Sequence, residues 1–166
     1  MSSAASTFRG PPTAGRPVFQ TSHLGEIEWE PECELFLPAG LPGFEAERRM
    51  MPLEIPAQRP LVYLQSLEHP EVCFVTLPVR TIDPQYQLRL SEDDRAALLL
   101  DPVRQPEIGA DVLCLILLLP ASGTVQVNLD APIVVNLHNS RCIQSFSTER
   151  AAGYFRLGDD HWEPVC

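Results

Sequence analysis

Prolines are spread along almost the whole chain, and they limit the length of any helix that it can form. The 166 residues include 17 prolines, about twice the usual share of roughly 5%. Between Pro31 and Pro132 the longest proline-free stretch is the 17 residues after Pro84. A proline inside a helix removes a hydrogen bond and collides with the preceding turn, so an all-helical fold is disfavoured.

Short apolar runs, separated by Pro, Gly or Asp-Pro clusters, predict β-strands. Val, Ile, Leu, Phe and Tyr fill these runs, and such residues fit the surface of a pleated sheet. The expected strands cover residues 17–21, 24–29, 33–37, 50–55, 61–67, 72–77, 85–90, 112–119, 124–129, 132–138 and 141–147. We therefore predict an all-β, mainly antiparallel fold with one or two short helices.

One helix is predicted after Ser91, which is a suitable N-cap with Asp94 three residues on and apolar residues 96–100 behind it. A second, short helical turn is expected over residues 45–50. The eight apolar residues 112–119 are far fewer than the roughly 20 that a membrane helix needs. This run predicts a central strand buried on both faces.

The chain length suits a single domain with a real core. Residues 1–17 are rich in Ser, Ala, Thr, Gly and Pro, which predicts a disordered N-terminal tail without the apolar segment of a secretory signal. Residues 158–166 are expected to form an acidic C-terminal tail. The β domain between the tails then covers residues 18–157.

The chain is acidic, with a formal net charge of −10 and no lysine. Direct binding to nucleic acid is disfavoured because phosphate contacts need a basic face. An acidic protein can instead engage a basic protein through complementary charge. Residues 18–47 carry seven glutamates and neither lysine nor arginine.

Five of these glutamates alternate along one segment, at positions 26, 28, 30, 32 and 34. Alternation would align them on one strand face, but Pro31 predicts a turn between two strands instead. Two interpretations remain open. The acids form a solvated edge that resists aggregation, or they form an acidic docking surface for a basic protein.

No pattern in the sequence indicates catalysis or a metal site. The histidines lack ligand spacing, and no phosphate-binding glycine loop occurs. The five cysteines form no C-x-x-C pair, which favours a reducing cytoplasm. We therefore expect a cytoplasmic protein that is not an enzyme and needs no cofactor.

The run Leu37-Pro38-Ala39-Gly40-Leu41-Pro42-Gly43-Phe44-Glu45 predicts a tight turn at Pro42-Gly43, with Leu41 and Phe44 either presented or buried by it. Further on lie Leu64-Gln65-Ser66 and the segment 128–136, N-L-D-A-P-I-V-V-N. Asn128, Asn136 and Asn139 would fix the turns around that segment. Alternatively, Asn136 and Gln144 present amides to a partner.

These segments, in this order and with Gln144 after them, resemble the flagellar assembly factor FliW family over roughly residues 19–157. The resemblance implies a small β-barrel-like single domain. It also implies a cytoplasmic regulator that binds the translational regulator CsrA, a small RNA-binding dimer, and flagellin. Flagellin synthesis would thereby be coupled to flagellin export. We expect a monomer without membrane or direct nucleic-acid contact.

From this resemblance we expect two groups of side chains at the partner surface, together with the amides of Asn136 and Gln144. The loop is shaped by Leu41, Pro42, Gly43 and Phe44, and the charge comes from Glu26, Glu28, Glu32, Glu34 and Glu45. Two alternatives stay open. The chain is a divergent paralogue acting only as a flagellin-binding chaperone, or it is an unrelated ligand-binding β-barrel or enzyme.

Overall fold

Antiparallel strands dominate the computed structural model, which describes residues 16–146 and 153–165. The body is a seven-stranded sheet in the order β11-β10-β7-β6-β5-β4-β3. Its strands are β3 (Leu35–Phe36), β4 (Arg49–Leu53), β5 (Val62–Ser66), β6 (Cys73–Pro78), β7 (Val112–Leu117), β10 (Ile133–Asn136) and β11 (Cys142–Gln144). Every neighbouring pair in this sheet is antiparallel, which confirms the predicted fold class.

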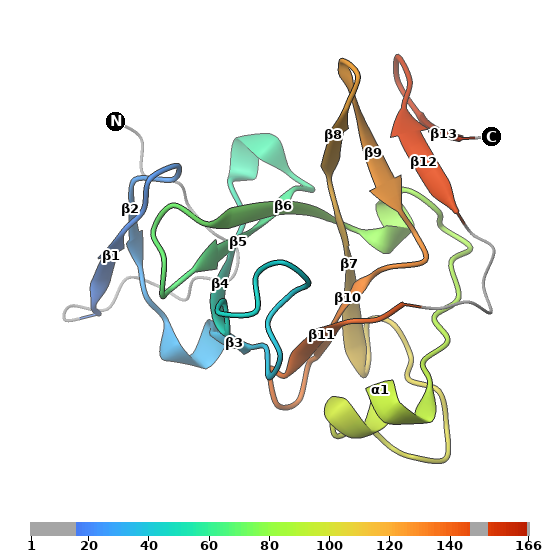
Figure 1. The fold of residues 1–166 in the computed structure, drawn as a ribbon, viewed down its shortest axis with the longest axis horizontal. Coiled ribbons are helices and arrows are strands. Elements are labelled where there is room, and N and C mark those ends of the chain that lie inside the picture. Colours follow the sequence, from blue (N-terminus) through green and yellow to red (C-terminus); the bar gives the residue numbers. More distant parts are fainter. Residues whose placement is uncertain (1–15, 147–152, 166) are drawn as a thin grey trace.

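The sheet curls until its two edges meet, and it encloses a barrel-like core (Figure 1). At the meeting point the Phe36 N–H donates to the Ser140 carbonyl at 3.0 Å, and Phe36 forms a parallel bridge with Arg141. The buried interior comprises Leu35, Leu37, Leu41, Met50, Val62, Leu64, Leu115, Ile133, Val135 and Cys142. The barrel-like fold implied by the resemblance is thus confirmed.

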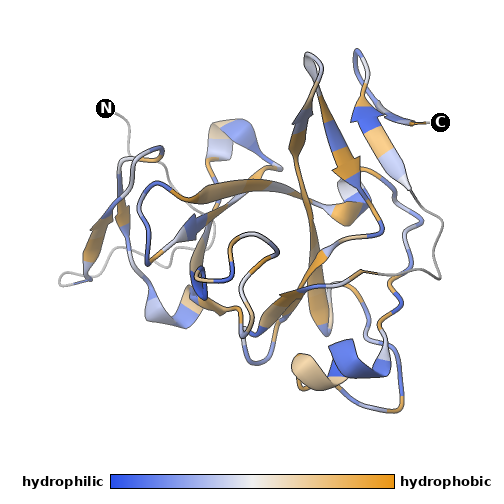
Figure 2. Cartoon of the chain, in the orientation of Figure 1, coloured by the Kyte–Doolittle hydropathy of each residue, from blue (hydrophilic) through white to orange (hydrophobic). Residues whose placement is uncertain are grey.

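β7 is an interior strand of the large sheet, between β10 and β6, as the apolar run 112–119 predicts, and most of its side chains are buried. Hydrophobic colour follows β6, β7 and β10, whereas α1 is mainly hydrophilic (Figure 2). The predicted strand is two elements, because the chain leaves β7 at Leu117 and enters β8 (Leu119–Ala121). The Leu118 N–H between them donates to the Val75 carbonyl at 2.9 Å.

A second sheet, in the order β13-β12-β9-β8, extends away from the barrel (Figure 1). It adds β9 (Thr124–Asn128), β12 (Tyr154–Leu157) and β13 (Trp162–Pro164) to β8. β13 falls within the expected acidic tail, and its Trp162 packs against the core cluster between the two sheets. Residues 1–15 of the expected N-terminal tail lie outside the described residues.

A short hairpin of β1 (Val18–Gln20) and β2 (Glu26–Glu28) begins the described chain. Its buried Ile27 packs with Met51 and Leu53 of β4. Three single turns of 3-10 helix connect strands, namely η1 (Pro31–Cys33), η2 (Pro56–Gln58) and η3 (Val79–Thr81). η1 begins at Pro31, where the sequence predicted an interruption of the glutamate-rich strand.

The predicted helix is present as α1 (Glu92–Ala97), and the Ser91 hydroxyl caps it by accepting the Asp94 N–H at 3.1 Å. The helix ends at Ala97, before the end of the apolar run 96–100, because the backbone of Leu99 has φ +57°. The left-handed conformation costs an ordinary residue about 1–2 kcal/mol. The surroundings of α1 must therefore hold this turn in place.

Two predicted elements are absent. Residues 85–90 form no strand, although Tyr86, Leu88 and Leu90 are buried. The Gln105 side chain pairs with the Leu90 backbone through both amide atoms (2.8 and 3.0 Å), and so takes the place of a neighbouring strand. The helical turn expected over residues 45–50 is also wrong, since Arg49 already begins β4.

Among the described residues, no helix has the length and apolar content to cross a membrane. Cys114 and Cys142 are buried, and burial raises the pKa of the Cys142 thiol. Burial also raises the pKa of the Cys73 thiol to about 11. Burial and the hydrogen bond to Glu30 together raise the pKa of the Cys33 thiol to about 11. These thiols act as small apolar side chains.

Leu115 tests whether the barrel interior carries the stability of the fold. Its side chain is completely buried on β7, so Leu115→Ala should lower the free energy of unfolding by about 2–5 kcal/mol. Leu119→Ala on β8 is the matched control, because Leu119 is 43% exposed. Denaturant unfolding of both variants measures the difference, and equal losses would contradict this description of the core.

Candidate functional site

The chain reverses sharply at Leu41-Pro42-Gly43-Phe44, as predicted. The Phe44 N–H donates to the Leu41 carbonyl at 2.7 Å, and the Leu41 N–H donates to the Phe44 carbonyl at 3.2 Å. Gly43 has φ +82°. Proline at the first central position and glycine with positive φ at the second are characteristic of a type II turn.

Gly40 is needed before the turn because the chain folds back directly onto it. It has φ +65°, and a Cβ at residue 40 would lie 2.5 Å from the Phe44 carbonyl oxygen. Nothing lies within 4 Å of the corresponding position at Gly43. The first glycine of the motif therefore permits close backbone packing, whereas the second only permits the turn.

The two large apolar residues that flank the turn have different environments. Leu41 is 2% exposed and belongs to the barrel core, so it is a core residue and not the partner contact that we expected. Phe44 is 43% exposed, and its ring meets Phe74 edge to face with 4.9 Å between centroids. The turn thus buries Leu41 and presents Phe44.

Glu45 carries a negative charge beside this presented ring. Its Oε1 accepts the Gly43 N–H at 3.0 Å. This bond, with a further one from the backbone N–H of Glu45, holds the pKa of the carboxyl below its ordinary value of 4.5. The side chain is exposed, so its charge is available to a partner.

A depression of about 290 Å³ lies where the turn meets the end of β11. It is lined by Ala39, Gly40, Pro42, Glu45, Ile143, Gln144 and Phe146. The fold thus brings together three expected site residues, Pro42, Glu45 and Gln144, from two segments that lie far apart in the sequence. Phe146 is 62% exposed, and sequence reasoning missed it because its only signal is a large aromatic at the end of a predicted strand.

Known proteins resemble this chain over most of its length. A family model described as FliW protein matches residues 18–153. That match spans most of the chain. The chain belongs to the FliW family.

Individual relatives carry the name of this family. The flagellar assembly factor FliW of Syntrophomonas wolfei is 30% identical over 126 residues, covering 75% of this chain and 78% of the relative. That of Oceanobacillus iheyensis is 33% identical over 118 residues, covering 71% and 78%. A crystal structure of the flagellar assembly factor FliW superposes with a TM-score of 0.70 at 26% identity, over 81% of this chain and 91% of the other.

The motif Leu64-Gln65-Ser66 fixes the β5–β6 hairpin through hydrogen bonds of its serine. The Ser66 hydroxyl accepts the N–H groups of Glu68 and His69, each at 3.0 Å, and donates to Glu47. Glu47 is 4% exposed, and its Oε1 lies 2.6 Å from Nδ1 of His69. This motif therefore orders a loop of the FliW domain.

The same hairpin contacts bring Glu47, Glu68 and His69 together. Each offers one atom that could bind a metal ion, and these atoms lie within 4.8 Å of one another. Histidine spacing in the sequence did not indicate this group, since the fold brings Glu47 to the hairpin. The bonds of Glu47 to Ser66 and His69 account for the arrangement without an ion.

The segment 128–136 also has a structural role. Asn136 is 2% exposed, donates to the Leu98 carbonyl at 2.9 Å and accepts the His138 N–H at 2.9 Å. Its amide is thus not available to a partner, contrary to that interpretation. Gln144 is half-buried and donates to the Ala131 carbonyl at 3.1 Å, while also lining the depression.

The glutamate-rich segment of this FliW-family protein offers fewer free charges than its sequence implies. Glu26 is exposed, and Glu28 is half-buried on the same face of β2. Glu32 is exposed and pairs with Arg16 at 3.1 Å. Glu34 is half-buried, receives two bonds from Arg49 (2.5 and 3.2 Å) and one from Trp29 (3.0 Å). It therefore joins β3 and β4 instead of facing a partner.

Gly40→Ala and Gly43→Ala test the two glycine roles. Both substitutions incur the cost of a positive φ, about 1–2 kcal/mol, but only Gly40→Ala adds a collision with backbone atoms. We expect Gly40→Ala to lower the free energy of unfolding by at least about 1 kcal/mol more than Gly43→Ala. Thermal or denaturant unfolding measures it, and an equal effect would show that the close approach is unimportant.

Glu34 should make the stability depend on pH. Its pKa lies below 4.5, chiefly because of the Arg49 hydrogen bonds. A pKa lower in the folded than in the unfolded state stabilises the fold above the unfolded value, and this contribution disappears as the pH falls through the folded pKa. Glu34→Gln should therefore lower stability at pH 7 and reduce its loss below pH 4.5. Glu26→Gln is the control, and identical pH profiles would refute this role.

Proposed function

We propose that this FliW-family protein is a cytoplasmic, non-enzymatic regulator that binds CsrA and flagellin and so couples flagellin synthesis to flagellin export. In this scheme free flagellin occupies the protein. Once flagellin is exported, the protein binds CsrA, which then releases flagellin mRNA for translation. The protein acts as a monomer.

The observation that carries this proposal is the surface around the Pro-Gly turn. Phe44 and Phe146 are both substantially exposed, and the depression of about 290 Å³ lies beside the turn. Exposed aromatic side chains next to a concave surface are typical of sites that bind proteins. The turn is rigid, because two backbone hydrogen bonds join Leu41 and Phe44 at its ends.

Charge supports a basic partner such as an RNA-binding protein. The chain carries a net charge of −10, and Glu45 stays ionised beside Phe44. Glu26 and Glu28 add charge on β2, whereas Glu34 is held by Arg49. Complementary charge accelerates association and favours the correct partner.

The alternative of a flagellin chaperone that has lost CsrA uses the same surface. It differs in outcome, because such a protein would bind flagellin alone.

The decisive experiment is calorimetric titration of the protein with CsrA from the same genome, with and without flagellin. We expect salt-sensitive binding that flagellin reduces. Phe44→Ala should weaken binding of at least one partner about tenfold or more. Tyr154→Ala is the matched control, since Tyr154 is a similarly exposed aromatic (48%) on β12 of the second sheet.

The paired substitution Glu26→Arg and Glu28→Arg tests the charge. It should weaken CsrA binding and slow association. Unchanged affinity in a folded variant would remove β2 from the proposed surface. Binding of flagellin without CsrA would indicate the chaperone, and binding of neither partner would refute the proposal.

A further inference from the structure

Residues 86–90 have the side-chain alternation of a strand, but they pair with no other strand in the part of the chain that the structure describes. Tyr86, Leu88 and Leu90 are buried, and Gln87 and Arg89 between them are exposed. This period of two is that of an extended chain. In such a chain the N–H and C=O of one residue point to the same side, and those of the residue two positions away share that side.

The Gln105 side chain shows on which side a neighbouring chain would pair. Its amide accepts the Leu90 N–H at 2.8 Å and donates to the Leu90 carbonyl at 3.0 Å. A residue of an antiparallel strand would make the same pair of bonds. The N–H and C=O of Leu88 point to this side too, and within residues 16–146 and 153–165 neither group has a hydrogen-bond partner. Leu88 is therefore the next pairing position along an open edge.

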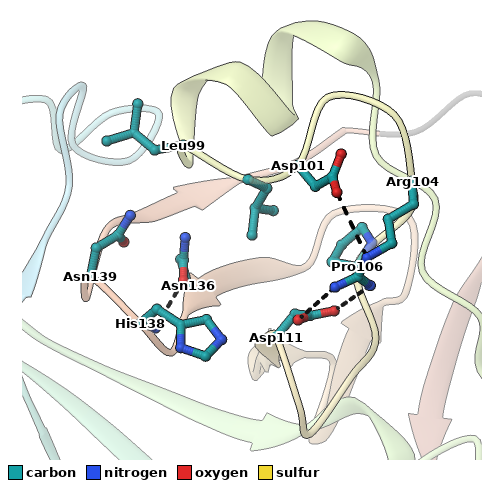
Figure 3. Close-up of a pocket in the computed structure, with 9 residues that line it drawn as sticks. Leu99, Asp101, Arg104, Pro106, Asp111, Asn136, His138 and Asn139 are labelled. Atoms are coloured by element: carbon teal, nitrogen blue, oxygen red, sulfur yellow. Dashed lines mark hydrogen bonds and ion pairs between the residues drawn. The ribbon is translucent and has the colours of Figure 1, made fainter.

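A pocket of about 310 Å³ lies along this edge. It is lined by residues 87–89, by residues 105–108 and by Arg80. The loop that carries residues 105–108 is tied across its two ends, because Arg104 makes two bonds to Asp111 (2.8 and 3.2 Å) next to Pro106 (Figure 3). The Glu107 N–H also donates to Asp111 at 2.8 Å. The open edge thus borders a pocket whose other lining segment is held in place.

Both arginines of this pocket lack a partner among the described residues. Arg80 and Arg89 are exposed, and neither makes an ion pair or a hydrogen bond there. Glu107 of the pocket pairs with neither of them, and nor do Asp83 and Glu92, the nearest acids along the chain. Most other described arginines bond to a carboxylate or to a backbone carbonyl, namely Arg16, Arg49, Arg59, Arg95, Arg104, Arg141 and Arg156. Two unpaired guanidinium groups at one pocket favour a ligand with carboxylates.

We propose that this pocket binds an extended, acidic segment of a protein partner, which adds to the edge as a strand. One residue of the segment exchanges two backbone hydrogen bonds with Leu88, as the Gln105 amide does with Leu90. A carboxylate of the segment pairs with Arg89 or Arg80. Binding by strand addition obtains its affinity from main-chain bonds and its specificity from side-chain contacts. The site is separate from the one proposed above, since no described residue lines both this pocket and the depression at Pro42.

Designed peptides of about eight residues, the length of an ordinary strand, test the proposal by calorimetry. The first peptide alternates glutamate and threonine. The second has proline in place of threonine, which removes backbone donors, and the third has lysine in place of glutamate. We expect the first peptide to bind and the other two to bind about tenfold more weakly or worse. The bound peptide should also slow hydrogen exchange of the Leu88 amide, as measured by NMR.

The double variant Arg80→Gln and Arg89→Gln should bind the first peptide about fivefold more weakly, with a smaller dependence on salt. Arg48→Gln is the matched control, because Arg48 is an exposed arginine outside this pocket. Failure of the first peptide to bind at about 1 mM, or equal binding by the double variant and wild type, would overturn the proposal. Displacement of the peptide by an equal concentration of inorganic phosphate would assign the pocket to small anions instead. CsrA takes no part in these titrations, so their outcome is independent of the proposed function.

Discussion

The arrangement of the molecule depends on the contact between the two sheet edges that closes the barrel, where the Phe36 N–H donates to the Ser140 carbonyl at 3.0 Å. β3 and β11 are the two edges of the large sheet, and the Phe36–Arg141 bridge joins them. The chain that leaves β3 then runs into the Pro-Gly turn. Closure therefore places this turn beside the end of β11, and their junction is the depression that Pro42 and Gln144 share.

Buried polar side chains stabilise this frame by bonding its loops. Asn136 holds the end of α1 through the Leu98 carbonyl, and Ser66 and Glu47 hold the β5–β6 hairpin. Buried polar groups are costly unless bonded, so each of these contacts specifies one arrangement of its loop. The exposed rings of Phe44 and Phe146 take no part in these hydrogen bonds. Bonded polar residues thus hold the frame, whereas exposed apolar residues form the surface proposed to bind partners.

Much of the fold could be predicted because its signals are local. Pro-Gly at 42–43 encodes a turn, Ser91 caps α1, and Pro31 interrupts the glutamate-rich strand. Residues 85–90 misled because their alternation is that of a strand, whereas a distant side chain, Gln105, satisfies the Leu90 backbone. The candidate site was predicted only in part, since exposure of Phe44 and burial of Leu41 depend on what packs against the turn.

The sequence by itself determined the class of fold, the turn and the acidic character, because proline geometry, residue alternation and charge act over a few neighbouring positions. It also determined the family, through three ordered segments. Only the tertiary structure decided which residues face solvent. Asn136 donates to the Leu98 carbonyl and Glu34 accepts from Arg49, so neither side chain is free at the surface. Phe146 lines the same depression as Pro42. These outcomes depend on contacts between residues far apart in the chain, which no local pattern records.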